Sequence, residues 1–404
     1  MGDDLDGAIE RLYARGDEEA MQSVAIGAPD ASDEQLARLA NVLATSGDFI
    51  ASTSDRVCDI ASTGGPGSLS TLLSPLFACA LGARVAKIAV PGRPAGGLDV
   101  LGSLAGFRTE LSVTEARDIY EACGYVHTGA GQCFCPLDAQ FFAWRQANGQ
   151  QAVPTLAIAS LLAKKLAAGA GRVVLDVRVG SHGNFGATLE LAKQNSQRFV
   201  SVARQLAIEA VCVLTLSDTP VQPWIGRGEA LVALSRVLTG RATGVLEQHA
   251  IACVRMAEIA AGVISESWEV LIDRATVANE RMLLAHGSDA QEFWSTVQTV
   301  SRSERASVVS ETAGHVSWNV DGLRAALVNR QLEVAPNAGH DFSDPCGVLL
   351  SELDEQSVEP GVILAGVRDV TDPVVLADRI AEQVCVADLP GDRRASAKPE
   401  VIGG

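Results

Sequence analysis

Positive charge is scarce in this 404-residue sequence. Its 32 lysines and arginines face 49 aspartates and glutamates, which gives a formal net charge of −17. A chain this acidic is repelled by the phosphates of nucleic acids and by anionic membrane surfaces. The composition therefore argues against both as partners. An anionic small-molecule substrate must be held by local groups against an unfavourable overall field.

Long apolar runs and closely paired cysteines are also missing. No segment reaches the roughly 18 uninterrupted apolar residues of a membrane span, and the acidic N-terminus lacks the apolar core of a secretory signal. The nine cysteines form no CxxC pair, and no second ligand pair follows Cys133 and Cys135 at zinc spacing. We therefore expect buried free thiols, no metal site and no cofactor, in a cytoplasmic protein.

What the sequence does contain is an α/β pattern. Residues 5–50 have the composition and caps of helices. Residues 55–91 give a strand, a glycine loop, a helix and a second strand, which is the βαβ unit of a parallel sheet. Residues 172–181 form a valine-rich strand, and short β-like pieces follow residue 310. These features predict an α/β fold with a small α+β portion at the C-terminus.

The glycine loop has the sequence STGGPGS over residues 62–68. A loop of this kind before a helix presents backbone N–H groups, and the helix dipole favours an anion there. The Walker A lysine and the Rossmann spacing are both absent. A plain tight turn is the alternative interpretation, but the density of hydroxyls favours an anion site; they belong to Ser62, Thr63, Ser68, Ser70 and Thr71.

A second group of polar residues comprises Arg145, Ser160 and Lys164. Ser160 and Lys164 are four residues apart, so they share one face of a helix. The surrounding sequence, LAIASLLAKKLAA, is otherwise apolar. From spacing alone, the lysines are better interpreted as the solvated end of an amphipathic helix than as a site.

Six segments, in order, resemble the thymidine and pyrimidine-nucleoside phosphorylase family. The stretch DIASTGGPGSLSTLLSPLFACALG resembles that family's DKHSTGGVGD…TS signature. FAWR, ASLLAKKLAAG and VVLDVRVGS resemble its base-binding and sheet segments, and two segments between 313 and 367 resemble its C-terminal domain. The resemblance covers roughly residues 32–370. A related family, anthranilate phosphoribosyltransferase, shares the glycine loop.

The resemblance implies a reversible phosphorolysis, in which phosphate attacks C1′ of a pyrimidine nucleoside and releases the base and a pentose 1-phosphate. It also implies a small discontinuous helical domain, a larger α/β domain with a mixed sheet that closes across a cleft, and a homodimer packed through the helical domain. The expected boundaries are 1–50 plus 136–170 for the helical domain, 51–135 plus 171–310 for the α/β domain, 311–390 for the C-terminal domain and 391–404 for a disordered tail.

The base-binding side of the family matches well. Arg145, Ser160 and Lys164 fall on its base-recognition positions, and Phe142 replaces the usual tyrosine beside the arginine. The resemblance implies that these side chains hydrogen-bond the pyrimidine. Arg145 and Lys164 would be catalytic, because they stabilise the charge that builds up on the leaving base.

The phosphate side matches poorly. The family's lysine falls on Ile60 and its histidine on Ala61, while its SGRG…HTGGTLD segment is shortened to PGRPAGGLD. We therefore expect weak phosphate binding and predict that Ile60→Lys strengthens it. The degenerate phosphate site would consist of Ser62, Thr63, Gly64, Gly65, Ser68, Thr71 and Arg93.

Three functions stay open at this point. The protein is an active phosphorylase in which Arg93 or Lys87 supplies the lost charge, or a hydrolase or base-exchange transferase that keeps the base site. The third is a non-catalytic protein that binds a nucleoside or base, or that partners another subunit. The sequence does not identify the base, the sugar or the nucleophile.

Overall fold

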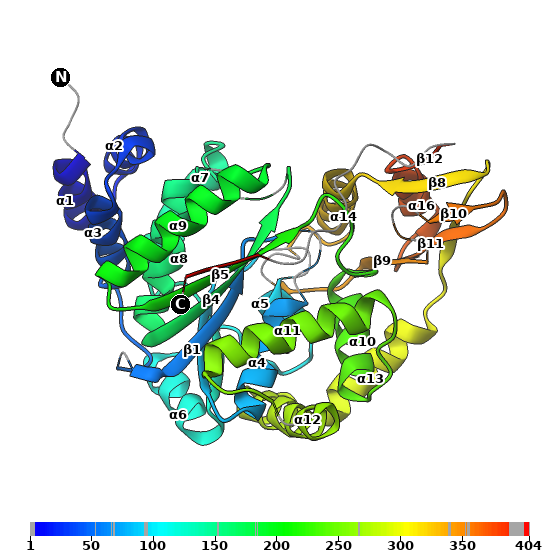
Figure 1. Cartoon of the computed structure of the whole chain (residues 1–404), viewed down its shortest axis with the longest axis horizontal. Coiled ribbons are helices and arrows are strands. Elements are labelled where there is room, and N and C mark those ends of the chain that lie inside the picture. The colour runs from blue at the N-terminus through cyan, green and yellow to red at the C-terminus, as the bar shows by residue number, and fades with distance from the viewer. Residues whose placement is uncertain are drawn as a thin grey trace.

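The structure is a computed structural model that describes residues 5–52, 54–65, 67, 69–92, 96–151, 153–181, 183, 185–265, 267–337, 341–351, 353, 356–387 and 400–403. Among these residues, no helix is long and apolar enough to cross a membrane. Figure 1 shows the N-terminal helices at one side of the molecule, the main sheet in the middle and the C-terminal strands at the opposite side.

The N-terminal segment is helical, as its caps predict. Ser32 forms a capping box, in which its Oγ accepts from the Gln35 N–H and the Gln35 side chain accepts from the Ser32 N–H. The apolar face of the helix that follows is buried against the rest of the chain. The elements are α1 (Leu5–Arg15), α2 (Glu18–Gly27), the 3₁₀ turn η1 (Ala28–Asp30) and α3 (Asp33–Ala44).

A six-stranded sheet forms the centre of the molecule, in the order β13-β5-β4-β1-β2-β3. The five strands from β5 to β3 are parallel, and β13 runs antiparallel to β5, so the predicted mixed sheet and βαβ unit are confirmed. The strands are β1 (Ser54–Ser62), β2 (Arg84–Ala89), β3 (Tyr125–Gly129), β4 (Ala170–Val179), β5 (Glu209–Leu216) and β13 (Glu400–Gly403).

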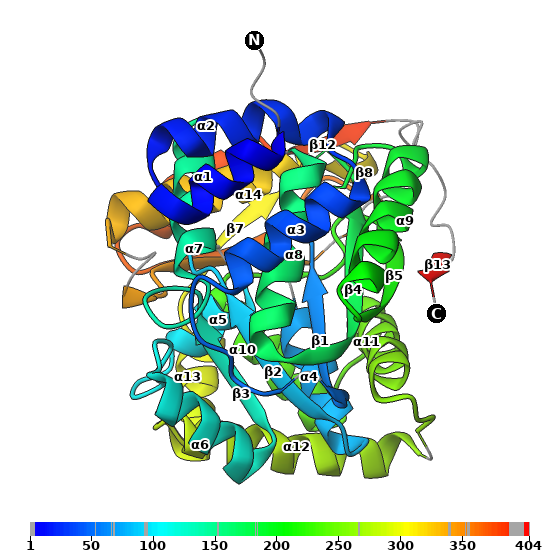
Figure 2. The ribbon, with the colours of Figure 1, turned by 90° about the vertical axis from the view of Figure 1, so that its left-hand side faces the viewer.

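Helices cover both faces of this sheet, which is why β4 is an almost continuous apolar run. One apolar cluster joins α1, α2, α3, α7 (Pro136–Ala147), α8 (Pro154–Ala168) and α9 (Leu189–Gln205) to β4 and β5. A second apolar cluster lies on the opposite face of the six-stranded sheet (Figure 2). Its helices are α4 (Ser70–Ala80), α10 (Arg227–Leu238), α11 (Val245–Ala261), α12 (Trp268–Ala285) and α13 (Ala290–Arg302).

Two short helices complete this part of the chain. α5 (Gly97–Gly102) follows β2, and α6 (Val113–Cys123) precedes β3. α6 begins with a capping box, because Ser112 accepts from the Glu115 N–H and the Glu115 carboxylate accepts from the Ser112 N–H. It ends at Gly124, which has a left-handed backbone.

The C-terminal part has the predicted α+β composition. Its two antiparallel sheets have the strand orders β10-β8-β12 and β6-β9-β11-β7, and they share an apolar cluster with two helices. The elements are β6 (Trp224–Ile225), β7 (Ala306–Val309), β8 (Gly314–Trp318), α14 (Val320–Val334), β9 (Cys346–Leu350), β10 (Ser357–Val358), β11 (Ile363–Asp369), α16 (Pro373–Ala381) and β12 (Val384–Ala387).

The end of the chain differs from the expected disordered tail. Residues 391–399 lie outside the described part, but Glu400–Gly403 pair with β5 as strand β13, and Lys193 contacts Glu400 at 2.8 Å. The composition of this segment gave no sign that its last residues could extend a sheet at an open edge. The division into domains stays a prediction.

Candidate active site

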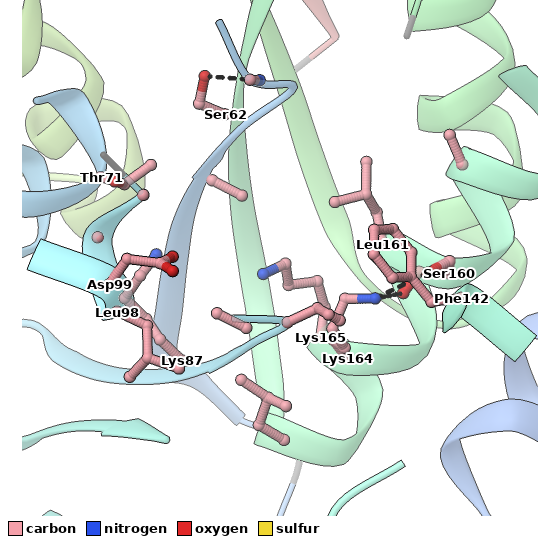
Figure 3. Close-up of a pocket in the computed structure, with 18 of the residues that line it drawn as sticks. Ser62, Thr71, Lys87, Leu98, Asp99, Phe142, Ser160, Leu161, Lys164 and Lys165 are labelled. Atoms are coloured by element: carbon pink, nitrogen blue, oxygen red, sulfur yellow. Dashed lines mark hydrogen bonds between the residues drawn. The ribbon is translucent and has the colours of Figure 1, made fainter. Parts of the chain in front are cut away.

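One cavity collects most of the residues that the sequence singled out. It lies where β1, β2 and β3 end, between the starts of α4 and α5 on one side and α7 and α8 on the other (Figure 3). The carboxyl ends of parallel strands are the usual place for a ligand in an open α/β sheet. The predicted site residues that line it are Ser62, Gly64, Gly65, Thr71, Phe142, Arg145, Ser160 and Lys164.

The two groups of residues face each other across the cavity. Figure 3 shows Thr71, Leu98 and Asp99 on one side, and Phe142, Ser160 and Leu161 on the other. Residues that are far apart in sequence therefore meet as the resemblance implies. Ser68 and Arg93, which were also expected at the anion end, lie outside the described residues.

Lys164 is buried and its ammonium group is fully engaged. Its Nζ donates to Asp138 Oδ2 at 2.6 Å, to Ser160 O at 2.6 Å and to Ser160 Oγ at 2.8 Å. A lysine has three N–H donors, so a base can be contacted only if one of these acceptors is exchanged. The interpretation as a solvated helix end is wrong. Sequence analysis missed Asp138, because no local spacing links α7 to α8.

Arg145 has a different set of contacts from the one expected. Its side chain is 2% exposed and donates to the backbone carbonyls of Gln150, Gln151 and Leu156. These bonds hold the segment between α7 and α8 in place. The Phe142 ring lies 5.9 Å from the Arg145 guanidinium carbon, so the two residues are adjacent in the cavity wall.

The glycine loop has a backbone that glycine adopts most easily, and amides in and directly after it are bonded within the fold. Gly64 and Gly65 have φ values of 118° and 120°, which disfavour any residue with a side chain. Ser62 Oγ accepts from the Gly64 N–H at 3.3 Å. Leu69 N–H, at the start of α4, donates to the Gln222 side chain at 3.0 Å, a contact that the sequence did not suggest.

Two of the hydroxyls expected at the anion site are used elsewhere. Thr63 Oγ1 accepts from the Arg178 N–H at 2.9 Å and is not among the residues that line the cavity, so its place in the phosphate site stays a prediction. Ser70 Oγ donates to Asp176 Oδ2 at 2.7 Å in the protein interior. Within the described residues, Ser62 and Thr71 are the loop hydroxyls that reach the cavity.

Ile60 does not lie where an anion would bind. Side chains alternate between the two faces of a strand, and Ile60 is fully buried in the apolar cluster around α4. Its neighbour Ala61 lines the cavity instead. The structural premise of the Ile60→Lys prediction is therefore wrong, because the new ammonium would enter the core.

A pair of lysines sharing one carboxylate lies beneath the cavity. Asp59 is completely buried, with Lys87 Nζ 2.5 Å from its Oδ1 and Lys165 Nζ in contact with its Oδ2. Burial tends to raise the pKa of Asp59, but Lys165 and Lys87 together hold it below its usual value. One carboxylate against two ammonium groups leaves a net charge of +1 beside the cavity that both lysines line.

Two further titratable residues line the same wall. Asp99 Oδ1 accepts from the Gly92 N–H at 2.8 Å and lies 3.5 Å from an Arg227 Nη2. His127 is 1% exposed, and its ring nitrogens make no hydrogen bond in the part of the chain that the structure describes. Burial, with the nearby Lys87, holds the pKa of His127 well below its usual value, so the imidazole is neutral. Neither residue was expected from the sequence.

Comparisons with known proteins find similarity over part of the chain. No protein-family model matches the chain. A pyrimidine-nucleoside phosphorylase of Staphylococcus haemolyticus is 31% identical over 239 residues, which are 57% of this chain and 54% of that protein. One of Staphylococcus aureus is 29% identical over 239 residues, with the same coverage. This part of the chain is similar to the pyrimidine-nucleoside phosphorylases. It spans about half the length of the curated relatives it matches.

A solved structure shows the fold of the chain. Anthranilate phosphoribosyltransferase from Thermus thermophilus matches with a TM-score of 0.52 and 17% identity, over 74% of this chain and 94% of that chain. An identity this low shows the fold alone. The fold expected from the resemblance is therefore confirmed.

Proposed function

We propose that the protein is a pentosyltransferase that cleaves the N-glycosidic bond of a pyrimidine nucleoside with phosphate as the acceptor. The observation that carries this proposal is a cavity that has the base-recognition residues on one wall, the glycine loop on the other and the lysine pair beneath them. The names of the related proteins support the same class of reaction.

The base would bind between α7 and α8. Lys164 would exchange one of its Ser160 contacts for an oxygen of the pyrimidine, and Ser160 Oγ would then be able to contact the base itself. When the C1′–N bond breaks, its electron pair moves onto the base. The positive charges of Lys164 and Arg145 would stabilise that negative charge in a site that excludes water.

The acceptor would bind at the glycine loop. A phosphate oxygen would form the new bond to C1′, and the proton of monohydrogen phosphate would pass to the departing base, so the products are the free base and a pentose 1-phosphate. The local charge of +1 from Asp59 and its two lysines supplies attraction that the chain as a whole, at −17, does not.

The deciding experiment is a panel of pyrimidine and purine nucleosides incubated with and without phosphate, with free base measured by chromatography. We expect base release from pyrimidine nucleosides only when phosphate is present. Release without phosphate would instead identify a hydrolase, and binding without release a non-catalytic protein. Lys164→Met should abolish release, whereas Lys193→Met, which removes a lysine paired with Glu400 outside the cavity, should not.

The proposed homodimer stays a prediction. Tyr13 and Ile26, on α1 and α2, are 58% and 72% exposed and offer apolar contact area on the helices expected to form the interface. Light scattering of the purified chain would give its mass directly, and a mass of one chain would contradict the proposal.

A further inference from the structure

We propose that Lys87 and His127 form the oxyanion subsite of this protein, and that they bind the phosphate group of inorganic phosphate or of a pentose 1-phosphate. The inference rests on the proposed function, because it assigns the acceptor half of the same cavity. The resemblance places a lysine and a histidine of the related family at the β1 positions that Ile60 and Ala61 occupy here. In this chain, Lys87 on β2 and His127 on β3 would supply those two contacts instead.

The sheet register places these two residues side by side. β2 and β3 are parallel neighbours, and Lys87 is the register partner of His127. Both side chains line the cavity. Partners in adjacent parallel strands lie on the same face of the sheet, so an ammonium group and an imidazole approach the cavity from adjacent positions.

Thr71 lies near His127 and also lines the cavity. A β-carbon added to Gly97 would lie 2.8 Å from Thr71 Oγ1 and 3.1 Å from His127 Cε1. The Thr71 hydroxyl and the His127 Cε1 edge therefore both pack close to Gly97, and any side chain at that position would have to displace one of them. A tetrahedral oxyanion has enough acceptor atoms to contact a hydroxyl, an imidazole N–H and an ammonium group together.

Lys87 retains a donor for such a ligand. Two of its three N–H groups go to Asp59 Oδ1 and to the Ile60 carbonyl oxygen, which leaves one. Lys165 also contacts Asp59, so the carboxylate does not neutralise both lysines. The remaining positive charge favours an anion over a neutral ligand.

His127 is the observation that points most directly to a ligand. A buried polar group without a hydrogen bond costs about 1–3 kcal/mol, and His127 has two such nitrogens. The adjacent His286 shows what a packing histidine does in this protein. Its Nδ1 contacts Met282 O at 2.8 Å and its Nε2 accepts from the His127 backbone N–H at 3.2 Å. The His127 ring, in contrast, lines the cavity, and both of its nitrogens are buried and unpaired among the described residues.

The test measures binding of the anion separately from catalysis. Inorganic phosphate and, in a second series, ribose 1-phosphate are titrated calorimetrically into the parent protein and its variants. We expect Lys87→Met to weaken binding of phosphate at least tenfold and Lys87→Arg to restore most of it. Asp59 keeps Lys165 as a partner in both variants, so the fold should tolerate the change. Lys193→Met is the matched control for loss of a positive charge, and it should leave binding unchanged.

His127→Phe separates a binding role from a packing role. Phenylalanine fills similar space without polar nitrogens, so we expect an unchanged or higher melting temperature together with weaker phosphate binding, about fivefold or more. A histidine that only packs would lower the melting temperature and leave the affinity for phosphate unchanged. His127→Gln, which keeps a donor and an acceptor, should retain more affinity than His127→Phe.

The outcomes distinguish this inference from the proposed function. The subsite is wrong if the parent binds neither phosphate nor ribose 1-phosphate at a concentration of about 10 mM, which is above a typical millimolar dissociation constant. It is also wrong if Lys87→Met and His127→Phe bind these anions with the affinity of the parent. Phosphate-dependent release of base that persists in both variants would refute the subsite and leave the proposed function standing. Loss of anion binding in both variants, with no release of base by the parent, would support the subsite and refute the proposed function. Binding of ribose 1-phosphate alone would assign the subsite to the sugar phosphate.

Discussion

Asp59→Asn should have opposite effects on the free protein and on the complex with phosphate. Asp59 accepts from Lys87 and Lys165 in the interior. Asparagine has nearly the same shape and keeps one acceptor oxygen, but it removes the negative charge. The two ammonium groups would then lack their shared counter-charge, and the local charge would change from +1 to +2.

The free variant should be much less stable. Removing one partner of a buried ion pair typically costs about 3–5 kcal/mol, because the charge that remains has lost its compensation. Burial already holds the pKa of Lys87 below its usual value. Loss of a proton from one of the lysines would therefore recover part of the lost free energy of unfolding. Because that proton is lost more readily at high pH, the loss of stability should be smallest at alkaline pH.

Phosphate should bind the variant more tightly. One additional unit charge at a separation of about 6 Å and an effective dielectric constant of about 20 contributes about 3 kcal/mol. Because about 1.4 kcal/mol corresponds to tenfold in affinity, the gain could reach about 100-fold. Partial deprotonation of the lysines reduces it, and we expect a gain of at least tenfold at pH 7.

The assay is thermal unfolding of both proteins across a series of phosphate concentrations at constant ionic strength. A ligand that binds only the folded state raises the free energy of unfolding, and once the ligand concentration exceeds the dissociation constant this increase grows with the logarithm of the concentration. The stabilisation by phosphate should begin at a lower concentration in Asp59→Asn than in the parent. Equal destabilisation at every phosphate concentration would refute the reasoning, because the lysine pair would then not contact the anion.

Three other substitutions have defined outcomes. Ile60→Lys should destabilise the fold by several kcal/mol and should not improve the binding of phosphate, because Ile60 lies in the apolar core. Ala61→Lys should improve the binding of phosphate, because Ala61 lines the cavity. Denaturant unfolding measures the stability of each variant, and calorimetry measures its affinity for phosphate. Lys164→Met should weaken pyrimidine binding at least tenfold and leave phosphate affinity within about threefold, as equilibrium titrations would show. Asp369→Asn should cost about 2 kcal/mol at pH 7 in urea unfolding, because hydrogen bonds from Arg330 help to hold the pKa of Asp369 at about 2. That stability is present above the unfolded pKa near 4 and is lost as the pH falls toward 2, so the two proteins should converge in acid.

Local signals predicted most of the fold correctly. The capping residues Ser32 and Ser112, the left-handed Gly124 and the apolar run of β4 each depend on short-range interactions. Such interactions can be recognised within a few residues of sequence. Strand β13 could not be recognised in this way, because it depends on an open edge of β5 that is formed far away in the chain.

The charges of the site were predicted least well. Lys164 and Lys165 resemble the solvated end of a helix, yet both are buried. Their carboxylate partners come from other elements, Asp138 on α7 and Asp59 on β1. Pairing over such sequence separations leaves no local pattern. The alternation along β1 is a local signal that does bear on the site. It puts Ile60 on the opposite face of the strand from Asp59 and Ala61, and the burial of Ile60 in the apolar cluster around α4 excludes it from the cavity wall.

The paired lysines also change the expected strength of phosphate binding. Helix-end amides and two hydroxyls alone support a site of about millimolar affinity, or about −4 kcal/mol. The net charge of +1 from Asp59, Lys87 and Lys165 adds up to about 3 kcal/mol at a separation of about 6 Å. The overall charge of −17 opposes this gain, although salt screens charges beyond about 8–10 Å. Phosphate should therefore bind with a dissociation constant between about 10 μM and 1 mM. A tighter site would require a cation beyond the described residues, and a weaker one would mean that Asp59 neutralises its lysines more completely than its two contacts indicate.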